Sequence, residues 1–376
     1  MYNISMLTRL FCDNYKCLVN FEFKPTPMQL LMGRNGSGKS TVFEILALLR
    51  DFAVRGDPCE DRLLGTTRTR WQDLPVQRFE LDVSGNGGIY NYELVVDEWG
   101  KPLLPRIRKE KVTFNGNPLY LFENGVVHLH NDQFEDRAQF PIFPKRSYLY
   151  EIESRPENAK LMWFKNWLDH VTVVQVDPKA MKRSQAQREA VYPAPDLSNF
   201  AEWYRHLRQD NSAGTDALRV SLQEIVDGFE GLDLKGPQNG TKELHVSVRT
   251  GMGGKPNGFT FSELSDGQRS LVGLYTLLHC ALVEHSTLCI DEPDNFIALS
   301  EIQPWLLLLI DRAEETSSQI MIASHHPEFL NQLASRNGVV IERSNAGPTL
   351  PPRAFELQND TTLTAAEIVA RGWNNV

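Results

Sequence analysis

Residues 33–40 have the sequence Gly-Arg-Asn-Gly-Ser-Gly-Lys-Ser, which is a complete Gly-x-x-x-x-Gly-Lys-Ser phosphate-binding loop. Its glycines allow successive backbone N–H groups to surround a β-phosphate, Lys39 can reach the β- and γ-phosphate oxygens, and Ser40 offers a hydroxyl to Mg²⁺. Residues 29–32 (Gln-Leu-Leu-Met) predict a short buried strand before the loop, and residues 41–50 predict a helix after it. This context argues against a chance match to a glycine-rich turn. The predicted nucleotide-binding residues of this region are Gly33, Asn35, Gly36, Ser37, Gly38, Lys39, Ser40 and Thr41.

A second apolar segment, residues 286–290, ends in Asp291 and Glu292. An open parallel sheet binds its ligands at the carboxyl ends of its strands. We therefore expect Asp291 to hold Mg²⁺ through a water molecule, and Glu292 to orient and deprotonate the water that attacks the γ-phosphate. Acidic residues at a strand end are common in isolation, but a complete phosphate loop upstream favours the catalytic interpretation.

A third apolar segment, residues 319–323, is followed by Ser324, His325, His326 and Pro327. A histidine at this strand end can hydrogen-bond the γ-phosphate and so distinguish ATP from ADP. His325 is the predicted residue and His326 is the alternative. A structural role for a histidine at this place is the competing interpretation.

The segments between these motifs differ in their predicted secondary structure. Alternating residues from Tyr2 to Pro25 predict two short strands. From Phe79 to Leu129, short strands are separated by turn signals such as Asn124-Gly125, which predicts an antiparallel meander. Residues 156–169 and 199–229 have the spacing of amphipathic helices. Residues 171–176, 244–248 and 258–261 predict strands.

The chain has 376 residues, enough for one large domain with insertions or for two domains. The order of elements predicts an α/β fold, in which a mixed or parallel sheet flanked by helices carries the phosphate loop. An antiparallel β subdomain and a helical insertion are added to it. We expect a single head with an N-terminal part of the nucleotide-binding core at 1–75, the β meander at 76–132, a mainly helical insertion at 133–257 and a C-terminal part of the core at 258–376.

Residues 264–269 (Leu-Ser-Asp-Gly-Gln-Arg) form a further motif upstream of the acidic strand end. Together with residues 33–40 as Walker A, this motif resembles the signature of the ABC-type ATPases of the RecF-like and SMC-like branch, often called AAA family ATPases in bacteria. Residues 14–16 (Asn-Tyr-Lys) resemble the Asn-Phe-Lys/Arg entry of that branch, 289–293 its Walker B, and 324–327 its switch-histidine segment. The resemblance covers nearly the whole chain and implies a P-loop ABC-type ATPase head.

The resemblance also implies a homodimer or a higher homo-oligomer. In that family ATP lies between two heads, and the signature of one subunit caps the γ-phosphate held by the Walker A of the other. Ser265, Gly267 and Gln268 are therefore expected to act in trans, with the serine hydroxyl and backbone N–H groups at a helix N-terminus binding phosphate.

The resemblance leaves two kinds of contact open. Gln175, which follows a predicted strand, is a candidate Q-loop glutamine and Mg²⁺ contact by its position, and Gln185 and Gln187 compete with it. Lys16 is a candidate contact to the base or the phosphates. Tyr15 is another candidate, although an aromatic residue near the N-terminus is as often part of the core.

The chain departs from the family pattern after Walker B. Residues 295–299 (Asn-Phe-Ile-Ala-Leu) stand where the family often has Asn-x-Leu-His-Pro. Because both the histidine and the proline are absent, the contacts of this segment at the dimer seam do not follow from the resemblance.

The composition restricts the partners. A formal net charge of −9 argues against a protein that coats nucleic acid with its whole surface. Two locally basic segments, Lys101 to Lys111 and Lys179 to Arg188, leave DNA or RNA contact open, although most such runs are solvated faces. The five scattered cysteines favour neither a disulfide framework nor a zinc site. The longest apolar run, around Leu306 to Ile310, is far shorter than the roughly 18 residues of a membrane span, so no membrane contact and a cytoplasmic location are expected.

These features favour an ATPase whose dimer opens and closes with ATP and gates a process related to nucleic acid. By family analogy, the most favoured role is defence against phage together with a separately encoded effector such as a nuclease or a toxin. The alternatives are a RecF-like DNA repair ATPase, the nucleotide-binding subunit of a membrane transporter, and a scaffold that binds ATP without hydrolysing it. The 226 residues between Lys39 and Ser265 disfavour a compact transporter cassette, and Glu292 disfavours the scaffold.

Overall fold

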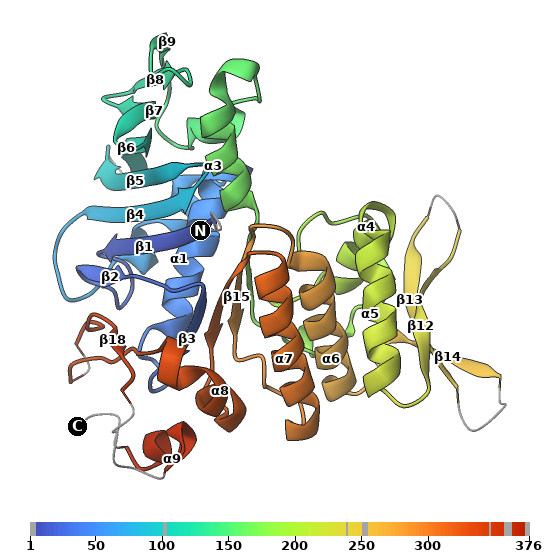
Figure 1. The fold of residues 1–376 in the computed structure, drawn as a ribbon. Coiled ribbons are helices and arrows are strands. Elements are labelled where there is room, and N and C mark those ends of the chain that lie inside the picture. The colour runs from blue at the N-terminus through green and yellow to red at the C-terminus, as the bar shows by residue number, and fades with distance from the viewer. Residues whose placement is uncertain are drawn as a thin grey trace.

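The computed structural model has a mixed α/β fold built on three β-sheets (Figure 1). It describes residues 5–100, 104–237, 240–249, 255–345, 347–356 and 363–372. Tyr2 of the predicted first strands and Lys101 of the first basic segment lie outside the described residues.

The largest sheet is antiparallel and contains the meander that the sequence predicts. Its tight turns place Asn86, Asn115 and Asn124 at positive φ angles, each directly before a glycine. Charged side chains on one face pair across the strands, as Arg9 does with Glu80. In spatial order the strands are β2 (Phe21–Phe23), β1 (Met6–Asp13), β4 (Val76–Gly85), β5 (Gly88–Trp99), β6 (Leu104–Phe114), β7 (Asn117–Glu123), β8 (Val126–His130) and β9 (Asp136–Pro141).

The second sheet has six strands and carries the predicted nucleotide motifs. In spatial order they are β10 (Val171–Val174), β15 (Thr287–Asp291), β16 (Gln319–Ala323), β3 (Met28–Met32), β17 (Gly338–Val340) and β18 (Arg353–Ala354). All neighbours are parallel except β17 and β18. Alternate residues face two hydrophobic cores: Leu31 and Met321 face the first core, whereas Leu30 and Ile322 face the second. Burial on both faces is typical of a parallel sheet covered on both sides.

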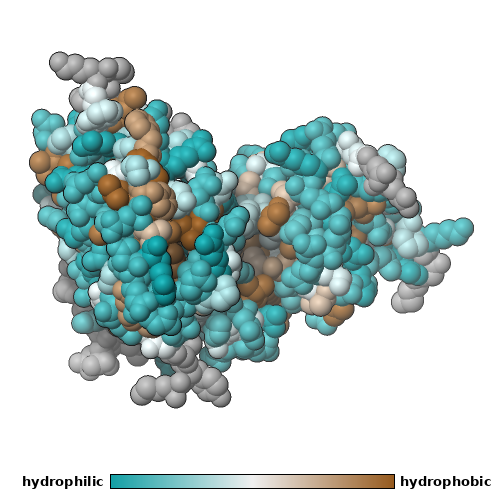
Figure 2. All heavy atoms as spheres, turned by 90° about the horizontal axis from the view of Figure 1, so that it is seen from above, coloured by the Kyte–Doolittle hydropathy of each residue, from teal (hydrophilic) through white to brown (hydrophobic). Residues whose placement is uncertain are grey.

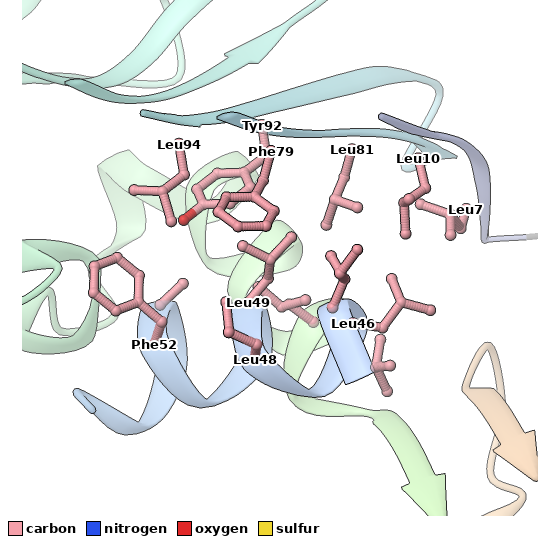
Figure 3. Close-up of a cluster of buried hydrophobic side chains, with 14 of the residues drawn as sticks. Leu7, Leu10, Leu46, Leu48, Leu49, Phe52, Phe79, Leu81, Tyr92 and Leu94 are labelled. Atoms are coloured by element: carbon pink, nitrogen blue, oxygen red, sulfur yellow. The ribbon is translucent and has the colours of Figure 1, made fainter. Parts of the chain in front are cut away.

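Helix α1 (Lys39–Arg55) lies between the antiparallel and the parallel sheet (Figure 1). Figure 3 shows its apolar residues, among them Leu46, Leu49 and Phe52, against side chains of the antiparallel sheet. On the other side, the Arg50 guanidinium donates to the Val171 carbonyl oxygen of β10 at 2.6 Å. Because α1 begins directly after the phosphate loop, this core fixes the position of the loop. Helix α3 (Ala159–Asp169) joins the same core, and the short α2 (Cys59–Arg62) follows α1.

The second core lies between the parallel sheet and the helices of the C-terminal half.

Viewed from above, hydrophilic residues dominate the surface, and a hollow separates two bulky parts of the molecule (Figure 2). Among the described helices, none combines the length and the apolar character needed to cross a membrane. The remaining helices are α4 (Phe200–Asp210), α5 (Ser212–Ile225), α6 (Asp266–Thr276) with a π-helical continuation (Leu277–Ala281), α7 (Leu299–Glu315), α8 (Pro327–Asn337) and α9 (Ala365–Ala370).

The segment 133–257, expected to be mainly helical, also contains most of a third β-sheet: the sequence pattern predicts strands at 244–248 and 258–261, but not the two other strands of this sheet. The central strand of this sheet is β13 (Lys242–Arg249), which pairs antiparallel with three others. One partner has only two residues and another lies at the end of a helical segment, so the pairing and not the local pattern defines these two. The three partners are β11 (Gln185–Ala186), β12 (Phe229–Lys235) and β14 (Pro256–Thr260).

Candidate functional site

Neighbouring parallel strands bring the predicted motifs to one edge of the second sheet. Strands β15, β16 and β3 are adjacent, and β10 lies beside β15. The register pairs Asp291 with Ala323, and Ala323 with Leu31. These strands therefore end at the same level, and the phosphate loop, Glu292 and the Ser324 segment leave the sheet side by side.

The phosphate loop has a backbone shape that requires glycine. Gly33, Gly36 and Gly38 have φ angles of 144°, 78° and 114°. A Cβ atom on Gly33 would come 2.0 Å from the Ile341 carbonyl oxygen, and one on Gly38 would come 2.9 Å from Thr349 Oγ1. Helix α1 then begins with no side-chain cap and no acidic residue in its first turn. Its first N–H groups are therefore available to an anion such as a phosphate.

The Lys39 side chain folds back into the phosphate loop. Its Nζ donates to the Gly33 carbonyl oxygen at 2.7 Å and lies 2.9 Å from His325 Nε2. Because an ammonium group cannot accept a hydrogen bond, Nζ donates and the imidazole accepts. Burial lowers the pKa of Lys39, and the carboxylates of Asp291 and Glu292 oppose this shift. Burial and the nearby Lys39 also lower the pKa of His325, which favours the neutral imidazole that this contact needs.

Ser40 and Asp291, the predicted Mg²⁺ pair, contact each other. Ser40, in the first turn of α1, hydrogen-bonds to the Asp291 carboxylate at the end of β15. Burial raises the pKa of Asp291, and the hydrogen bond from Ser40 opposes this shift. Mg²⁺ is bound by oxygen ligands, usually one or two carboxylates together with substrate phosphates and water. A hydroxyl beside a buried carboxylate, next to a phosphate loop, fits that requirement.

Glu292, the predicted base, has an unusual backbone conformation with a φ of 48°. Its N–H donates to the Ala323 carbonyl oxygen at 2.8 Å. Its Oε2 accepts a hydrogen bond from Asn295 Nδ2 at 2.9 Å. Asn295 therefore orients the carboxylate of Glu292, a role that the sequence pattern did not indicate.

The two histidines of the switch segment have different surroundings. His326 is the N-cap residue of α8, and its Nδ1 accepts the N–H of Glu328 at 3.3 Å. His325 instead contacts Lys39. The Ser324 hydroxyl donates to the Asp294 carboxylate at 2.6 Å and accepts the His326 N–H at 2.9 Å, which fixes the turn. This geometry favours His325, the predicted residue, over His326.

The signature motif lies at the start of α6. Ser265 is the N-cap residue: its Oγ accepts the N–H of Gln268 at 3.2 Å, and Gln268 Oε1 accepts the N–H of Ser265 at 3.0 Å. Gly267 lies close to the loop after Walker B, because a Cβ there would come 3.0 Å from the Phe296 carbonyl oxygen. Ser265 and Gln268 are exposed. Helix α6 belongs to the second core and α1 to the first (Figure 1), so the signature faces outward from a different part of the chain than the phosphate loop.

Arg269, the last residue of the signature motif, has a role that the sequence analysis missed. It is 1% exposed, and its guanidinium donates to three backbone carbonyl oxygens, including that of Pro178 at 2.7 Å. Pro178 follows Gln175 by three residues, and Gln175 follows β10 beside the Walker B strand. Gln185, by contrast, belongs to the third sheet. A Q-loop role for Gln175 remains a prediction, and the Arg269 contact connects the segment three residues later to the signature motif.

Lys16 lies beside the start of α1, where it is paired with Glu44. Its Nζ contacts the two Glu44 carboxylate oxygens at 2.5 and 2.6 Å, and the Tyr15 hydroxyl donates to the same carboxylate at 2.9 Å. Tyr15 is buried in the first core, so the core interpretation is correct for this residue. A nucleotide contact of Lys16 remains a prediction.

Two basic residues in the described part of the first basic segment are ion-paired. Arg106 binds Asp97 at 2.7 Å, and Lys109 binds Glu93 at 2.9 Å, both between β6 and β5. These pairs support the interpretation of β6 as a solvated face.

Comparison with known proteins supports the fold. The family model described as AAA domain, putative AbiEii toxin, Type IV TA system matches residues 30–331. The crystal structure of the SMC head bound to the C-winged helix domain of ScpA is 12% identical, has a TM-score of 0.54, and aligns over 94% of this chain and 99% of that one. The SMC head domain from Thermotoga maritima is 14% identical, with a TM-score of 0.46 and coverage of 93% and 99%. No curated protein matches the chain. The family model and the structure with a TM-score of 0.54 confirm the predicted α/β fold and the predicted resemblance to an ABC-type, SMC-like P-loop ATPase head.

Proposed function

The chain belongs to this family of AAA-domain proteins, and we propose that it is an ATPase that binds ATP with Mg²⁺, hydrolyses it and dimerises around it. One observation carries the proposal. The phosphate loop, the Ser40–Asp291 pair, Glu292 and His325 lie together at one edge of the parallel sheet. This is the set of groups that phosphoryl transfer to water requires.

Each of these groups has its own task. Lys39 exchanges its contacts with Gly33 and His325 for phosphate oxygens, and the uncapped start of α1 adds N–H donors. Ser40 and Asp291 would hold Mg²⁺, which would neutralise charge on the phosphates. Glu292, oriented by a hydrogen bond, positions the attacking water and accepts its proton.

The signature is proposed to act on a second copy of the chain. Ser265 and Gln268 are exposed on α6, which packs in a different core from α1. A helix N-terminus with an exposed serine hydroxyl is a suitable cap for a phosphate held by another subunit. Two such contacts related by a twofold axis complete two sites in one homodimer.

For the cellular role we propose defence against phage in the cytoplasm with a separately encoded effector, a nuclease or a toxin. The description of the family names a putative AbiEii toxin and a type IV toxin–antitoxin system, which supports a role of this kind. DNA or RNA remains a proposed trigger or target.

Light scattering on the Glu292→Gln protein, with and without ATP and Mg²⁺, tests the ATPase proposal. We expect a monomer without nucleotide and a stable dimer with ATP, because the variant binds ATP but lacks the base. The Lys39→Ala protein is the control and should stay monomeric. Equal ATP hydrolysis by the parent and Glu292→Gln proteins would rule out Glu292 as the base.

Mass spectrometry of proteins that copurify with the trapped dimer tests the cellular role. A nuclease or toxin supports the defence proposal. A membrane permease would instead favour the transporter alternative, and DNA repair proteins would favour the RecF-like one.

A further inference from the structure

A segment near the C-terminus lies against the phosphate loop. It comprises Ile341–Asn345 and Gly347–Leu350, and we call it the brace. The Ile341 N–H donates to the Met32 carbonyl oxygen at 2.7 Å, which ties the brace to the strand before the loop. The Thr349 N–H donates to the Cys17 carbonyl oxygen at 2.8 Å, which ties its other end to the segment after β1.

The brace also binds the carbonyl side of the loop. A phosphate loop functions only if its N–H groups face the ligand, which directs carbonyl oxygens away from the ligand. Arg343 Nη1 donates to the Gly36 carbonyl oxygen at 3.3 Å, and Thr349 Oγ1 donates to the Ser37 carbonyl oxygen at 2.8 Å. The carbonyl oxygens at the start of the loop are held by Lys39 instead.

These two sets of donors behave differently when a nucleotide binds. Lys39 is itself a phosphate-binding group, so it must leave the carbonyl oxygens that it contacts. The brace contributes no group to the predicted phosphate contacts, so its hydrogen bonds can persist while Lys39 moves. The brace is therefore the part of the structure that can preserve the shape of the loop during binding.

Thr349 makes an enclosed contact with the loop itself. It is 3% exposed, and its hydroxyl fills the space behind Gly38, where an added Cβ would come 2.9 Å from Oγ1. The Ser37 carbonyl oxygen that it binds belongs to the peptide that joins Ser37 to Gly38, the residue that precedes α1. A rotation of this peptide would turn loop N–H groups away from a bound phosphate.

We propose that Thr349 is a positioning residue for nucleotide binding, which holds the Ser37–Gly38 peptide in its ligand-binding orientation through one hydroxyl. The inference rests on the proposed ATP binding and adds to it a residue from outside the nucleotide-binding motifs of the sequence. Thr349 touches no ligand and acts only through the loop.

Isothermal titration of the nucleotide-free proteins with MgATP and MgADP tests this role. The Thr349→Val substitution keeps the shape but removes the hydroxyl, which leaves a buried carbonyl oxygen without its donor. We expect about tenfold weaker binding of both nucleotides. Thr349→Ser retains the hydroxyl and should restore the affinity to within about twofold of the parent. If Thr349→Val does not fold, Thr349→Ala removes the same hydroxyl without a methyl group in its place.

Thr215→Val provides a matched control. Thr215 is also buried, and its hydroxyl donates to the Ser212 carbonyl oxygen at 2.9 Å on α5, which belongs to the second core. We expect this variant to lower the melting temperature without changing nucleotide affinity. Parental affinity in folded Thr349→Val, or equally weak binding by Thr349→Ser, would overturn the inference alone. Failure of the parent to bind ATP, or unchanged binding by Lys39→Ala, would overturn the proposed function itself.

Discussion

At the scale of single residues, the hydrogen bond from Asn295 to Glu292 predicts a selective effect on turnover. Asn295→Ala removes the donor that orients the carboxylate of Glu292. We expect kcat to fall about tenfold, because a general base contributes only in the correct position, whereas the dissociation constant for MgATP should stay within about twofold. Steady-state kinetics and nucleotide titration measure the two quantities.

Asn331→Ala is the control for this substitution. Asn331 uses its side-chain oxygen to bind the Ala366 N–H, a contact between α8 and α9. This variant should retain the parental kcat. A parental kcat in Asn295→Ala would show that the hydrogen bond has no part in catalysis.

A second residue, Glu110, predicts how stability depends on pH. Burial raises the pKa of Glu110 to about 7, against hydrogen bonds from Ser147, Tyr92 and Tyr120, which lower it. The folded protein therefore holds this proton more tightly than the unfolded chain, whose carboxyl has the ordinary value of 4.5. The contribution of Glu110 to the free energy of unfolding, roughly 3 kcal/mol, is complete below about pH 4.5 and is lost as the pH rises through about 7.

Urea unfolding of the parent and Glu110→Gln proteins at pH 5 and pH 8 measures this effect. The parent should lose more stability than the variant between the two pH values, because glutamine does not titrate. Glu123→Gln, at the exposed end of β7 in the same sheet, should keep the pH dependence of the parent. Equal pH dependence in the parent and Glu110→Gln would contradict the assignment.

The sequence predicted those site residues whose chemistry is carried by motif spacing, such as Lys39 and Asp291. It did not predict Glu110 as a buried residue. An irregularity between Val95 and Val96 in the pairing of β5 with β6 shifts the alternation of β6, and Glu110 then faces the core. Asn295 and Thr349 were also missed, because loop geometry and not a local pattern brings each to its partner.

At the scale of elements, we expect the N-terminal cap of α6 to have two functions. Ser265 closes a capping box with Gln268 and, in the proposed dimer, also binds phosphate in trans. Ser265→Ala should cost about 1 kcal/mol of stability and should abolish the ATP-dependent dimer of the Glu292→Gln protein.

Helix α9 supplies the matched control for this cap. Thr364 closes the same type of capping box with Glu367, at a helix that carries no predicted nucleotide contact. Thr364→Ala should lose a comparable amount of stability but keep the ATP-dependent dimer in light scattering. Normal dimerisation of both variants would exclude the role of Ser265 in trans.

Elements with a strong local pattern were predictable, and those defined by pairing were not. The meander strands and α1 follow from alternation and helical spacing, although α1 ends at Arg55 and not near residue 50. Gly56, with a φ of 75°, is the C-cap that ends it. Strand β12 begins at Phe229, where helical spacing ends, and exists because β13 pairs with it across the turn that follows.

At the scale of the whole molecule, the division of the site between two cores predicts complementation between two inactive variants. Lys39→Ala destroys the phosphate loop of one chain but keeps its signature, and Ser265→Arg blocks the signature but keeps the loop. Each protein alone should be inactive, because both of its sites contain a defective half.

In a mixed dimer, one site combines an intact loop with an intact signature. Because neither variant is expected to form a homodimer around ATP, the dimers in an equal mixture are mixed dimers with one intact site, so activity should recover to at most about half of the parental rate per chain. The recovery should also fall on dilution, because the dimer dissociates. If the mixture stays inactive at every ratio, or if Ser265→Arg alone hydrolyses ATP at the parental rate, the site is complete within one chain and the signature has no role in trans.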